Sequence, residues 1–340
     1  MKTRLKNHLQ NSTELKWIPD GFHFLGPEES AKRRNLLNLL HGYFNEKGFL
    51  EIQMPTFDFT SSFQNHVNPA EHGKFFKIKD GYGNEISPSH DLTLQAVKGM
   101  AGFGEKKGNY RLYYISKIWK DQSQYNGARR EFLQAGAEII GHSNEGTFKL
   151  ILKILDEIFE LISFKKKITI VLGNILPFYY IAEKLKLNAQ EKETLTRLMY
   201  SKDTEEIRNF LSGKKGSRDI FDILHHLLFS YSFREILPAL LILEGKYGFP
   251  LKNCIKETEE LLKFSENMKS IEICPDFSLV RDMDYYTGFV FQGYAGRLSF
   301  PLVQGGAYDR LFQKFTGEEK NACGFSLNID IIEELIREEQ

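Results

Sequence analysis

The sequence predicts an α+β fold in which a largely antiparallel sheet is flanked by helices and interrupted by a helical insertion. Aromatic and β-branched segments typical of strands lie on both sides of residues 177–269, whereas that block shows almost only helical patterns. Hydrophobic residues make up 41% of the 340 residues, which is enough to form a large core. We therefore predict a core formed by residues 1–176 and 270–340, with residues 177–269 inserted as a helical unit.

The first predicted element is a helix that begins at Pro27 and ends at Gly48. Proline suits the first helical position because its missing N–H has no partner there, and glycine is favoured just after a helix ends. Leucine and phenylalanine side chains recur between them at helical spacing. Residues Phe49–Met54 then alternate as a short strand, which Pro55 ends.

Two longer strands are predicted at Arg111–Lys120 and Arg130–Gly141, because both segments are rich in aromatic and β-branched residues. The polar stretch between them predicts a hairpin loop, so the two strands are expected to be antiparallel neighbours. Helices are predicted before this hairpin, from Leu92 to Met100, and after it, from Phe148 to Ile162.

Beyond the insertion, strands are predicted at Ser278–Tyr294, Leu298–Val303 and Gly324–Asn328, followed by a C-terminal helix. The Gly-Gly pair in Gln304–Gly306 predicts a tight turn between the second and third of these strands. Strands on both sides of the helical block therefore complete one sheet.

Composition and motifs exclude several classes of function. Forty-five basic and 45 acidic residues give no net charge, so the electrostatic signature of a nucleic-acid binder is missing. The three cysteines form no CxxC pair, and no nucleotide-binding, HExxH or GxSxG motif occurs, so no metal, cofactor or nucleophile site is predicted. The N-terminus lacks an apolar signal-peptide region, and Leu227–Leu243 is too short and too charged to cross a membrane. We expect a soluble, cytoplasmic protein.

Polar residues within the predicted strand Arg130–Gly141 form a first candidate site. Side chains alternate along a strand, so Gln134 and Glu138 share a face with Gly136 between them. One interpretation is a pocket floor, in which the carboxylate and the carboxamide flank the bare backbone at Gly136 and receive a cationic or donor-rich small ligand. The other is a strand whose polar side faces solvent; a buried glutamate would need a partner, and this distinguishes the two.

Further candidate residues lie in two other segments. Asp91 and Thr93 stand at the start of the predicted helix Leu92–Met100, where Asp91 is either a helix N-cap or a ligand contact. Arg281 precedes the aromatic pair Tyr285 and Tyr286. An arginine can clamp a carboxylate, and phenols provide both an apolar wall and a hydroxyl.

Five segments in the same order resemble the catalytic core of class II aminoacyl-tRNA synthetases, specifically histidyl-tRNA synthetase. The helix, strand and Pro55 resemble the first class II motif, and YRLYYISKIWK with RREFLQAGAEIIG resembles the second. LVRDMDYYTGFVF and QGGAYDRL resemble the two signatures of the histidine-specific enzymes, and GFSLNIDII occupies the place of the third motif. The resemblance covers nearly the whole chain and implies a class II synthetase-like sheet.

The sequence departs from the synthetases where they bind ATP. This chain has Lys120 where the synthetases have the motif-two arginine that contacts the α-phosphate of ATP. It has Gln122 in place of the glutamate two residues later, and Ala128 in place of the arginine that follows the loop glycine. The motif-three arginine corresponds to Ile331, and Ser89 stands where an arginine is common. Because stabilising transferred phosphates requires fixed positive groups, the resemblance implies that ATP activation is lost.

The residues that resemble the histidine pocket are retained instead. The resemblance assigns histidine binding to seven of them: Asp91, Thr93, Gln134, Glu138, Arg281, Tyr285 and Tyr286. The chain also ends without room for an anticodon-binding domain, which resembles the regulatory subunits of ATP phosphoribosyltransferase. For this family the resemblance implies no catalytic activity, a homodimer formed through the first motif, and a hetero-oligomer with the short-form catalytic subunit. Such a complex carries out the first step of L-histidine biosynthesis under feedback inhibition by histidine.

Two alternatives remain open from the sequence. A minimal enzyme could still form an aminoacyl-adenylate if Lys120 replaced the arginine, although lysine and arginine differ in geometry. An RNA-binding paralogue is the second alternative, and the neutral charge balance disfavours it.

Overall fold

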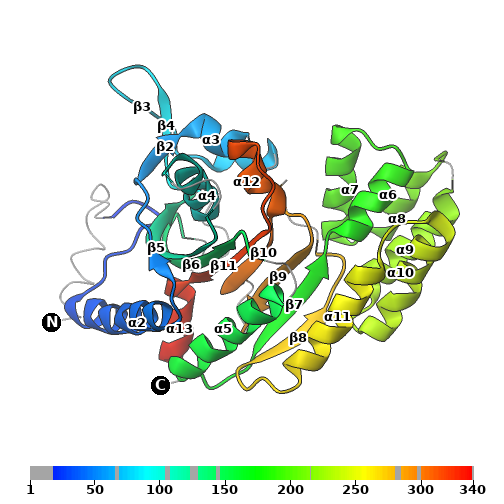
Figure 1. The fold of residues 1–340 in the computed structure, drawn as a ribbon. Helices are drawn as coiled ribbons and strands as arrows, with labels where there is room; N and C mark the ends of the chain where they lie inside the picture. The colour runs from blue at the N-terminus through cyan, green and yellow to red at the C-terminus, as the bar shows by residue number, and fades with distance from the viewer. Residues whose placement is uncertain are drawn as a thin grey trace, which may run out of the picture.

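The computed structural model describes residues 18–65, 69–103, 108–122, 129–142, 146–214, 216–279, 285–296 and 300–338. Its centre is an eight-stranded sheet of order β1-β5-β6-β11-β10-β9-β7-β8 (Figure 1). In that order the strands are Leu50–Glu51, Tyr110–Trp119, Glu131–Ile140, Ala322–Asn328, Val303–Ala307, Phe289–Tyr294, Ile168–Asn174 and Ile271–Pro275. The inner pairs are antiparallel, whereas β1 pairs with β5 and β7 with β8 in parallel.

Helices cover both faces of this sheet (Figure 1). One face packs against α2 (Pro27–Glu46), α5 (Thr147–Leu161) and α13 (Ile329–Glu338) in the largest hydrophobic cluster. The opposite face packs against α4 (Leu92–Phe103) and α12 (Asp309–Thr316). Alternation along β6 divides its side chains accordingly: Ala135, Ala137 and Ile139 enter the first cluster, and Ile140 enters the second.

Six helices separate β7 from β8 and share a hydrophobic cluster of their own. They are α6 (Leu176–Lys184), α7 (Ala189–Ser201), α8 (Thr204–Leu211), α9 (Ser217–Phe229), α10 (Phe233–Tyr247) and α11 (Lys252–Ser265). Most of this group lies beside the sheet rather than on it (Figure 1). The observed helices agree with the helical pattern of the sequence, and the treatment of 177–269 as a separate unit stays a prediction.

A second, smaller sheet of order β2-β4-β3 lies between β1 and α4 along the chain. Its strands are Phe57–Phe59, Glu85–Pro88 and Ile78–Lys79, with the short helix α3 (Thr60–Gln64) and the 3-10 helix η1 (Pro69–Lys74) beside them in sequence. The sheet projects from the core (Figure 1). Pro88 at the end of β4 leads directly into the segment that starts α4, so this sheet positions one wall of the site described below.

The secondary structure predicted for the strongly periodic segments is confirmed, whereas the predictions for the glycine-rich segments need correction. Helix α2 begins at Pro27, and Gly48 follows it with a φ of +74°. The predicted strand Ser278–Tyr294 is a strand only over β9, and part of it, 280–284, lies outside the described residues. The turn predicted at Gln304–Gly306 is wrong, because these residues form the middle of β10. The strands β7 and β8 and the small sheet were not predicted.

Close packing explains why β10 contains Gly305. A Cβ built there would lie 2.3 Å from the carbonyl oxygen of Gly324 and 2.6 Å from the ring of Phe291, and a backbone oxygen cannot move aside. At Gly288 the nearest atom to such a Cβ is 3.6 Å away. The glycine in β10 is therefore needed for space and not for a turn.

We predict that Gly305→Ala lowers the free energy of unfolding by about 1–3 kcal/mol, as overpacking does in other cores. Gly288→Ala, the matched control, should leave it nearly unchanged. Urea unfolding followed by circular dichroism would measure both, and equal stabilities of the two variants would contradict the packing explanation.

Candidate functional site

A pocket lies on the α4 side of the sheet, where the end of β4, the start of α4 and strands β5, β6, β10 and β11 meet. Its volume is about 520 Å³, including the part that is open to solvent. We call it the ligand pocket, and it is lined by His90, Asp91, Leu92, Thr93, Ile118, Lys120, Phe132, Gln134, Tyr285, Tyr286, Gln304, Gly305, Gly306, Tyr308, Gly324, Phe325 and Ser326. Segments far apart in the sequence therefore supply its polar and aromatic groups.

Asp91 has a structural role and a place in the ligand pocket at the same time. Its Oδ1 accepts a hydrogen bond from the backbone N–H of Leu94 at 2.9 Å, which caps α4. Its Oδ2 accepts a hydrogen bond from the hydroxyl of Tyr285 at 2.9 Å. The residue is only 6% exposed, and a carboxylate has acceptor capacity beyond these two bonds. The two interpretations of Asp91 from the sequence are thus compatible.

Glu138 lies fully buried behind the pocket wall, 0% exposed. Its Oε1 accepts a hydrogen bond from Tyr114 at 2.9 Å, and its Oε2 accepts one from Tyr308. Thr93 approaches the Tyr114 hydroxyl at 3.4 Å. Burial raises the pKa of Glu138 from 4.5 to about 7, and the charge of Asp91 adds to this, while the hydrogen bonds oppose it. The buried glutamate therefore has the partners that the pocket interpretation required.

Gly136 does not leave a gap for a ligand, so this part of the sequence interpretation is wrong. A Cβ built on Gly136 would lie 2.4 Å from ring and hydroxyl atoms of Tyr114, which occupies the space. In the same way, a Cβ on Gly324 would lie 1.7 Å from Oε2 of Glu138. The two glycines make room for the buried tyrosine and glutamate, and the ligand pocket lies on the other side of Thr93 and Tyr308.

His90 forms an apolar part of the pocket wall despite its polar ring. The ring lies 4.3 Å from that of Phe75 and 6.2 Å from that of Phe63, measured between centroids. It is buried, and neither ring nitrogen makes a hydrogen bond of good geometry. Burial, together with the positive charges of Lys120 and Lys74, lowers the pKa of His90 to about 3. The imidazole is therefore neutral at physiological pH.

A second pocket, of about 1120 Å³ including the part that is open to solvent, lies next to the first and shares five lining residues with it: Lys120, Phe132, Gln134, Gln304 and Ser326. We call it the adjacent pocket; its remaining lining residues are Gln122, Arg129, Phe300, Pro301, Leu302, Asn328, Ile331 and Glu334. The guanidinium of Arg129 lies 2.5 Å from Oδ1 of Asp330, so it faces a carboxylate of the protein itself. Apolar side chains make up much of the rest of this lining.

Comparison with known proteins decides the family. The sequence profile described as "Histidyl-tRNA synthetase" matches residues 21–332. An ATP phosphoribosyltransferase regulatory subunit of Leptospira interrogans serogroup Icterohaemorrhagiae serovar copenhageni is 41% identical over 337 residues, with 98% of each chain covered. The protein of the same name from Caldanaerobacter subterraneus subsp. tengcongensis is 27% identical, covering 92% of this chain and 81% of that one. The chain belongs to the ATP phosphoribosyltransferase regulatory subunit family.

Solved structures show that the fold is that of histidyl-tRNA synthetase. An ATP phosphoribosyltransferase regulatory subunit/histidyl-tRNA synthetase from Bacillus halodurans superposes with a TM-score of 0.77 at 24% identity, covering 95% of this chain and 84% of that one. A histidine–tRNA ligase subunit from Alicyclobacillus acidocaldarius gives 0.75 at 18% identity, covering 96% and 99%. At these identities the likeness concerns the fold alone, and the class II synthetase-like sheet predicted from the sequence is confirmed.

Most of the seven residues that the resemblance assigned to histidine binding lie close together in the structure. Asp91, Thr93, Gln134, Tyr285 and Tyr286 all line the ligand pocket. Glu138 lies behind that wall, where it contacts two tyrosines instead of the open space. Arg281 lies outside the described residues.

Sequence reasoning missed the two tyrosines that hold Glu138. Tyr308 is the tyrosine of QGGAYDRL, the segment that resembles a histidine-specific signature, so a signal for it was present. Tyr114 belongs to β5 and lies opposite Gly136 of β6 in the strand register. The alternating pattern of β5 gave no reason to distinguish this tyrosine from other core residues.

Within the described residues, no helix is long and apolar enough to span a membrane, and no group of three or more His, Cys, Asp or Glu side chains is placed to hold a metal ion.

We predict that Glu138→Gln changes how stability depends on pH. Because folding raises the pKa of Glu138 from 4.5 to about 7, its contribution to stability is full below pH 4.5 and is lost as the pH rises through 7. Glu138→Gln should remove this loss, so the variant gains stability relative to the wild type between pH 5 and 8.

Thermal unfolding of both proteins across this range would measure the difference. His90 acts in the opposite sense, because its lowered pKa costs stability as the pH falls below 6.5, but it is present in both proteins and cancels. A constant difference between the two proteins across the range would show that Glu138 does not titrate there.

Proposed function

We propose that this chain is a non-catalytic regulatory subunit that activates a short-form ATP phosphoribosyltransferase catalytic subunit. In this role it supports the transfer of a phosphoribosyl group to ATP, the first step of L-histidine biosynthesis, and mediates feedback inhibition by histidine. We further propose a cytoplasmic hetero-oligomer in which this chain forms a homodimer. The observation that carries the proposal is a hydroxyl-rich pocket containing the carboxylate of Asp91, placed beside a second pocket whose Arg129 is already paired with Asp330.

The chemistry of the ligand pocket suits L-histidine. Asp91 provides a negative charge for the ammonium group, and Thr93, Gln134 and the tyrosine hydroxyls can exchange hydrogen bonds with the imidazole and the carboxylate. Aromatic side chains from Tyr285, Tyr286 and Tyr308 provide flat apolar walls for a ring. We assign Arg281 to the ligand carboxylate on the basis of the family resemblance.

The charges of the adjacent pocket support the loss of ATP activation. Lys120 and Arg129 are its basic residues among the described lining, and Glu334 opposes them. Arg129 is held by Asp330, and Ile331 stands where the synthetases have an arginine. Transfer of phosphoryl or adenylyl groups needs several fixed positive charges, so this lining favours a regulatory role over catalysis.

Reconstitution with a short-form catalytic subunit tests the proposal. The catalytic subunit should form product faster with this chain than alone, and histidine should inhibit the complex more strongly than the isolated catalytic subunit. Because coupling between sites is reciprocal and typically about 1–3 kcal/mol, the catalytic subunit should also change the histidine affinity of this chain. A catalytic subunit whose rate and histidine sensitivity are unaffected would contradict the proposal.

One observation favours the alternative of a minimal enzyme that forms an aminoacyl-adenylate: Lys120 lines both pockets. Histidine-dependent exchange of pyrophosphate into ATP is the direct test. Measurable exchange by the purified chain would establish that alternative, and we expect none.

We predict that Asp91→Asn weakens histidine binding about tenfold or more, because the ammonium group loses a charge-assisted partner. Asparagine still accepts the hydrogen bond from Leu94, so helix α4 should remain capped. Titration calorimetry with L-histidine measures the affinity.

Asp203→Asn is the matched control, because Asp203 caps α8 in the same way and does not line the ligand pocket. If both variants bound histidine as the wild type does, Asp91 would have no role in recognition.

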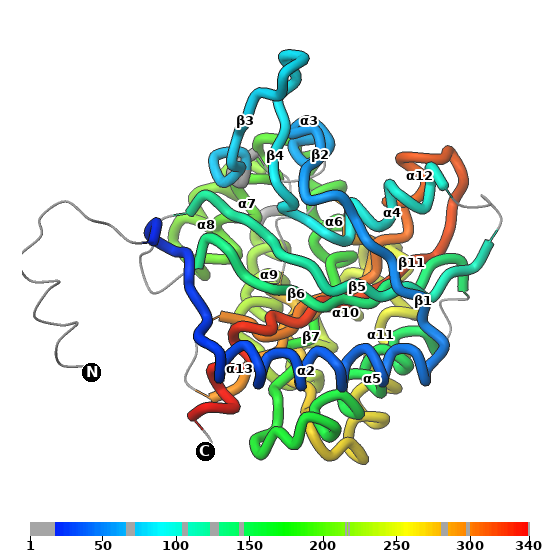
Figure 2. The backbone as a smooth tube through the Cα atoms, turned by 90° about the vertical axis from the view of Figure 1, so that its left-hand side faces the viewer, coloured from blue at the N-terminus to red at the C-terminus, as the bar shows by residue number. Residues whose placement is uncertain are grey.

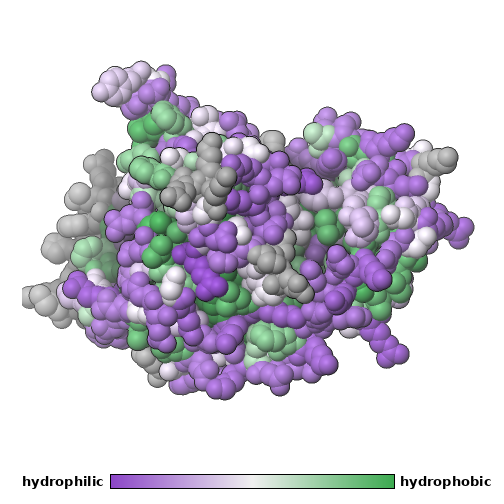
Figure 3. Space-filling model, in the orientation of Figure 1, coloured by the Kyte–Doolittle hydropathy of each residue, from purple (hydrophilic) through white to green (hydrophobic). Residues whose placement is uncertain are grey.

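The proposed homodimer fits an apolar surface on the first-motif side of the molecule. Figure 2 shows α2, β1 and β2 on this side, and β1 forms an edge of the large sheet. Leu39 of α2 is 45% exposed and Leu50 of β1 is 66% exposed, and Phe57 and Phe59 of β2 are also exposed. Hydrophobic side chains also gather over the base of the small sheet in Figure 3. An exposed strand edge with apolar neighbours is a surface that another chain commonly covers.

We predict that Leu50→Glu shifts this chain from dimer toward monomer, because a charge would be buried in the subunit contact. Leu241→Glu is the matched control, since Leu241 is 50% exposed but lies on α10. Sedimentation equilibrium would measure the association, and a dimer equally stable in both variants would exclude this surface as the contact.

A further inference from the structure

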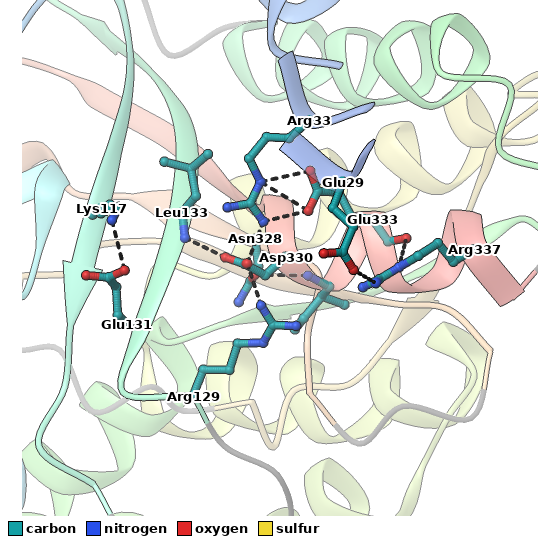
Figure 4. Close-up of polar contacts among 11 residues, drawn as sticks. Glu29, Arg33, Lys117, Arg129, Glu131, Leu133, Asn328, Asp330, Glu333 and Arg337 are labelled. Carbon is teal, nitrogen blue, oxygen red and sulfur yellow. Dashed lines mark hydrogen bonds and ion pairs between the residues drawn. The ribbon is translucent and has the colours of Figure 1, made fainter. Parts of the chain in front are cut away.

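A cluster of four charged side chains joins helix α2 to the pockets; we call Arg33, Arg129, Asp330 and Glu333 the Asp330 cluster. Asp330 is in the first turn of α13, and its side chain is 5% exposed. Its Oδ1 lies 2.7 Å from Nη2 of Arg33 and 2.5 Å from Nη1 of Arg129. Figure 4 shows that the carboxylate of Asp330 lies between these two arginines.

The other oxygen of Asp330 reaches the sheet. Oδ2 accepts a hydrogen bond from the backbone N–H of Leu133 at 2.6 Å, near the start of β6 (Figure 4). The next residue, Gln134, lines both the ligand pocket and the adjacent pocket. The carboxylate thus contacts the backbone directly before a residue that a bound ligand would touch.

The two arginines belong to different parts of the molecule. Arg33 comes from α2, does not line either pocket, and also binds Glu333 through Nε at 2.9 Å. Arg129 lines the adjacent pocket. The charges balance within the cluster, because two guanidinium groups face two carboxylates. If either carboxylate is lost, the two arginines keep more positive charge than the remaining carboxylate can neutralise.

We propose that Asp330 is a positioning residue that couples the ligand pocket to helix α2. Any shift of β6 at Gln134 changes the position of the Leu133 N–H, and Asp330 passes this change to the ion pairs that hold Arg33. By the same route, contacts made on α2 by a second subunit alter the position of Gln134. This inference rests on the proposed function, in which histidine occupies the pocket and α2 belongs to a subunit contact.

The geometry distinguishes this role from a purely local one. Arg33 does not line either pocket, so an effect of Arg33→Gln on ligand affinity has to pass through the cluster. Asp330→Asn keeps an acceptor for the Leu133 N–H but removes the charge that both arginines share. Arg33→Lys keeps the charge, but a single ammonium group cannot reproduce the forked contact with two carboxylates, so it should restore only part of the coupling.

Glu157→Gln provides a matched control. Glu157 also holds α2, because it lies 2.7 Å from Nζ of Lys47 and accepts a hydrogen bond from Tyr43 at 2.7 Å. It belongs to α5 and does not contact either pocket. This variant therefore loosens α2 without interrupting the route from Asp330 to Gln134.

The first arm of the test uses the full chain without ligand. Hydrogen exchange with mass spectrometry should show faster exchange in Asp330→Asn at the start of β6, because a neutral amide is a weaker acceptor for the Leu133 N–H, and in α2, which loses an ion pair. Glu157→Gln should affect α2 and α5 only. Faster exchange confined to α2 in Asp330→Asn would overturn the proposal.

The second arm measures the histidine affinity of this chain with and without Leu50→Glu, the change expected to separate the homodimer, and the ratio of the two affinities is the coupling factor. We expect Asp330→Asn and Arg33→Gln to reduce this factor about fivefold or more, Arg33→Lys to reduce it less, and Glu157→Gln to leave it unchanged. An unchanged factor in Asp330→Asn, with clear coupling in the wild type, would overturn the proposal and leave the proposed function intact. Absence of histidine binding by the wild type would refute the proposed function instead, and the exchange arm would then decide whether Asp330 joins β6 to α2.

Discussion

The buried carboxylate of Glu138 is the constraint on which the site depends. A charged or protonated carboxyl group with no access to water needs hydrogen-bond partners, and here two tyrosine hydroxyls provide them. One tyrosine comes from β5 and the other from the junction between β10 and α12. The hydrogen bonds therefore join three separate segments of the chain at one point directly behind the ligand pocket.

This network also explains the small residues around it. Tyr114 fits only because residue 136 lacks a side chain, and Glu138 fits only because residue 324 lacks one. Both glycines have ordinary backbone conformations within strands, so their role is to allow close approach and not to form turns. The space behind the pocket wall is consequently filled by the side chains of Tyr114 and Glu138.

The sequence predicted the elements with strong periodicity and missed those defined by contacts between distant segments. Helices α2, α4 and α5 and the β5–β6 hairpin follow from patterns that each segment carries by itself. In contrast, β7 and β8 are short strands whose parallel pairing depends on the helices between them. Gly305 was predicted to lie in a turn because glycine favours turns, whereas its place in β10 follows from the nearby carbonyl of Gly324.

The same distinction applies to the candidate site. Alternation along one strand correctly placed Gln134 and Glu138 on the same face, because that depends only on the strand itself. What fills the space over Gly136 depends on which residue of β5 lies opposite, and the sequence alone does not give that register. Only the folded chain shows that the space belongs to Tyr114 and that the ligand pocket begins beyond it.

The charged groups near the adjacent pocket differ from the Glu138 network in one important respect. Glu138 is held by neutral hydroxyl groups inside the core, whereas Asp330 is shared by cationic side chains from helix α2 and from the edge of the adjacent pocket. Both of these arginines are bound to carboxylates of the same chain. The Asp330 carboxylate contacts two guanidinium groups and a backbone N–H, whereas the Glu138 carboxylate lies between two buried phenols. In the proposed coupling, a change in the ligand pocket therefore reaches another subunit on the side of Asp330, because this carboxylate contacts both β6 and α2.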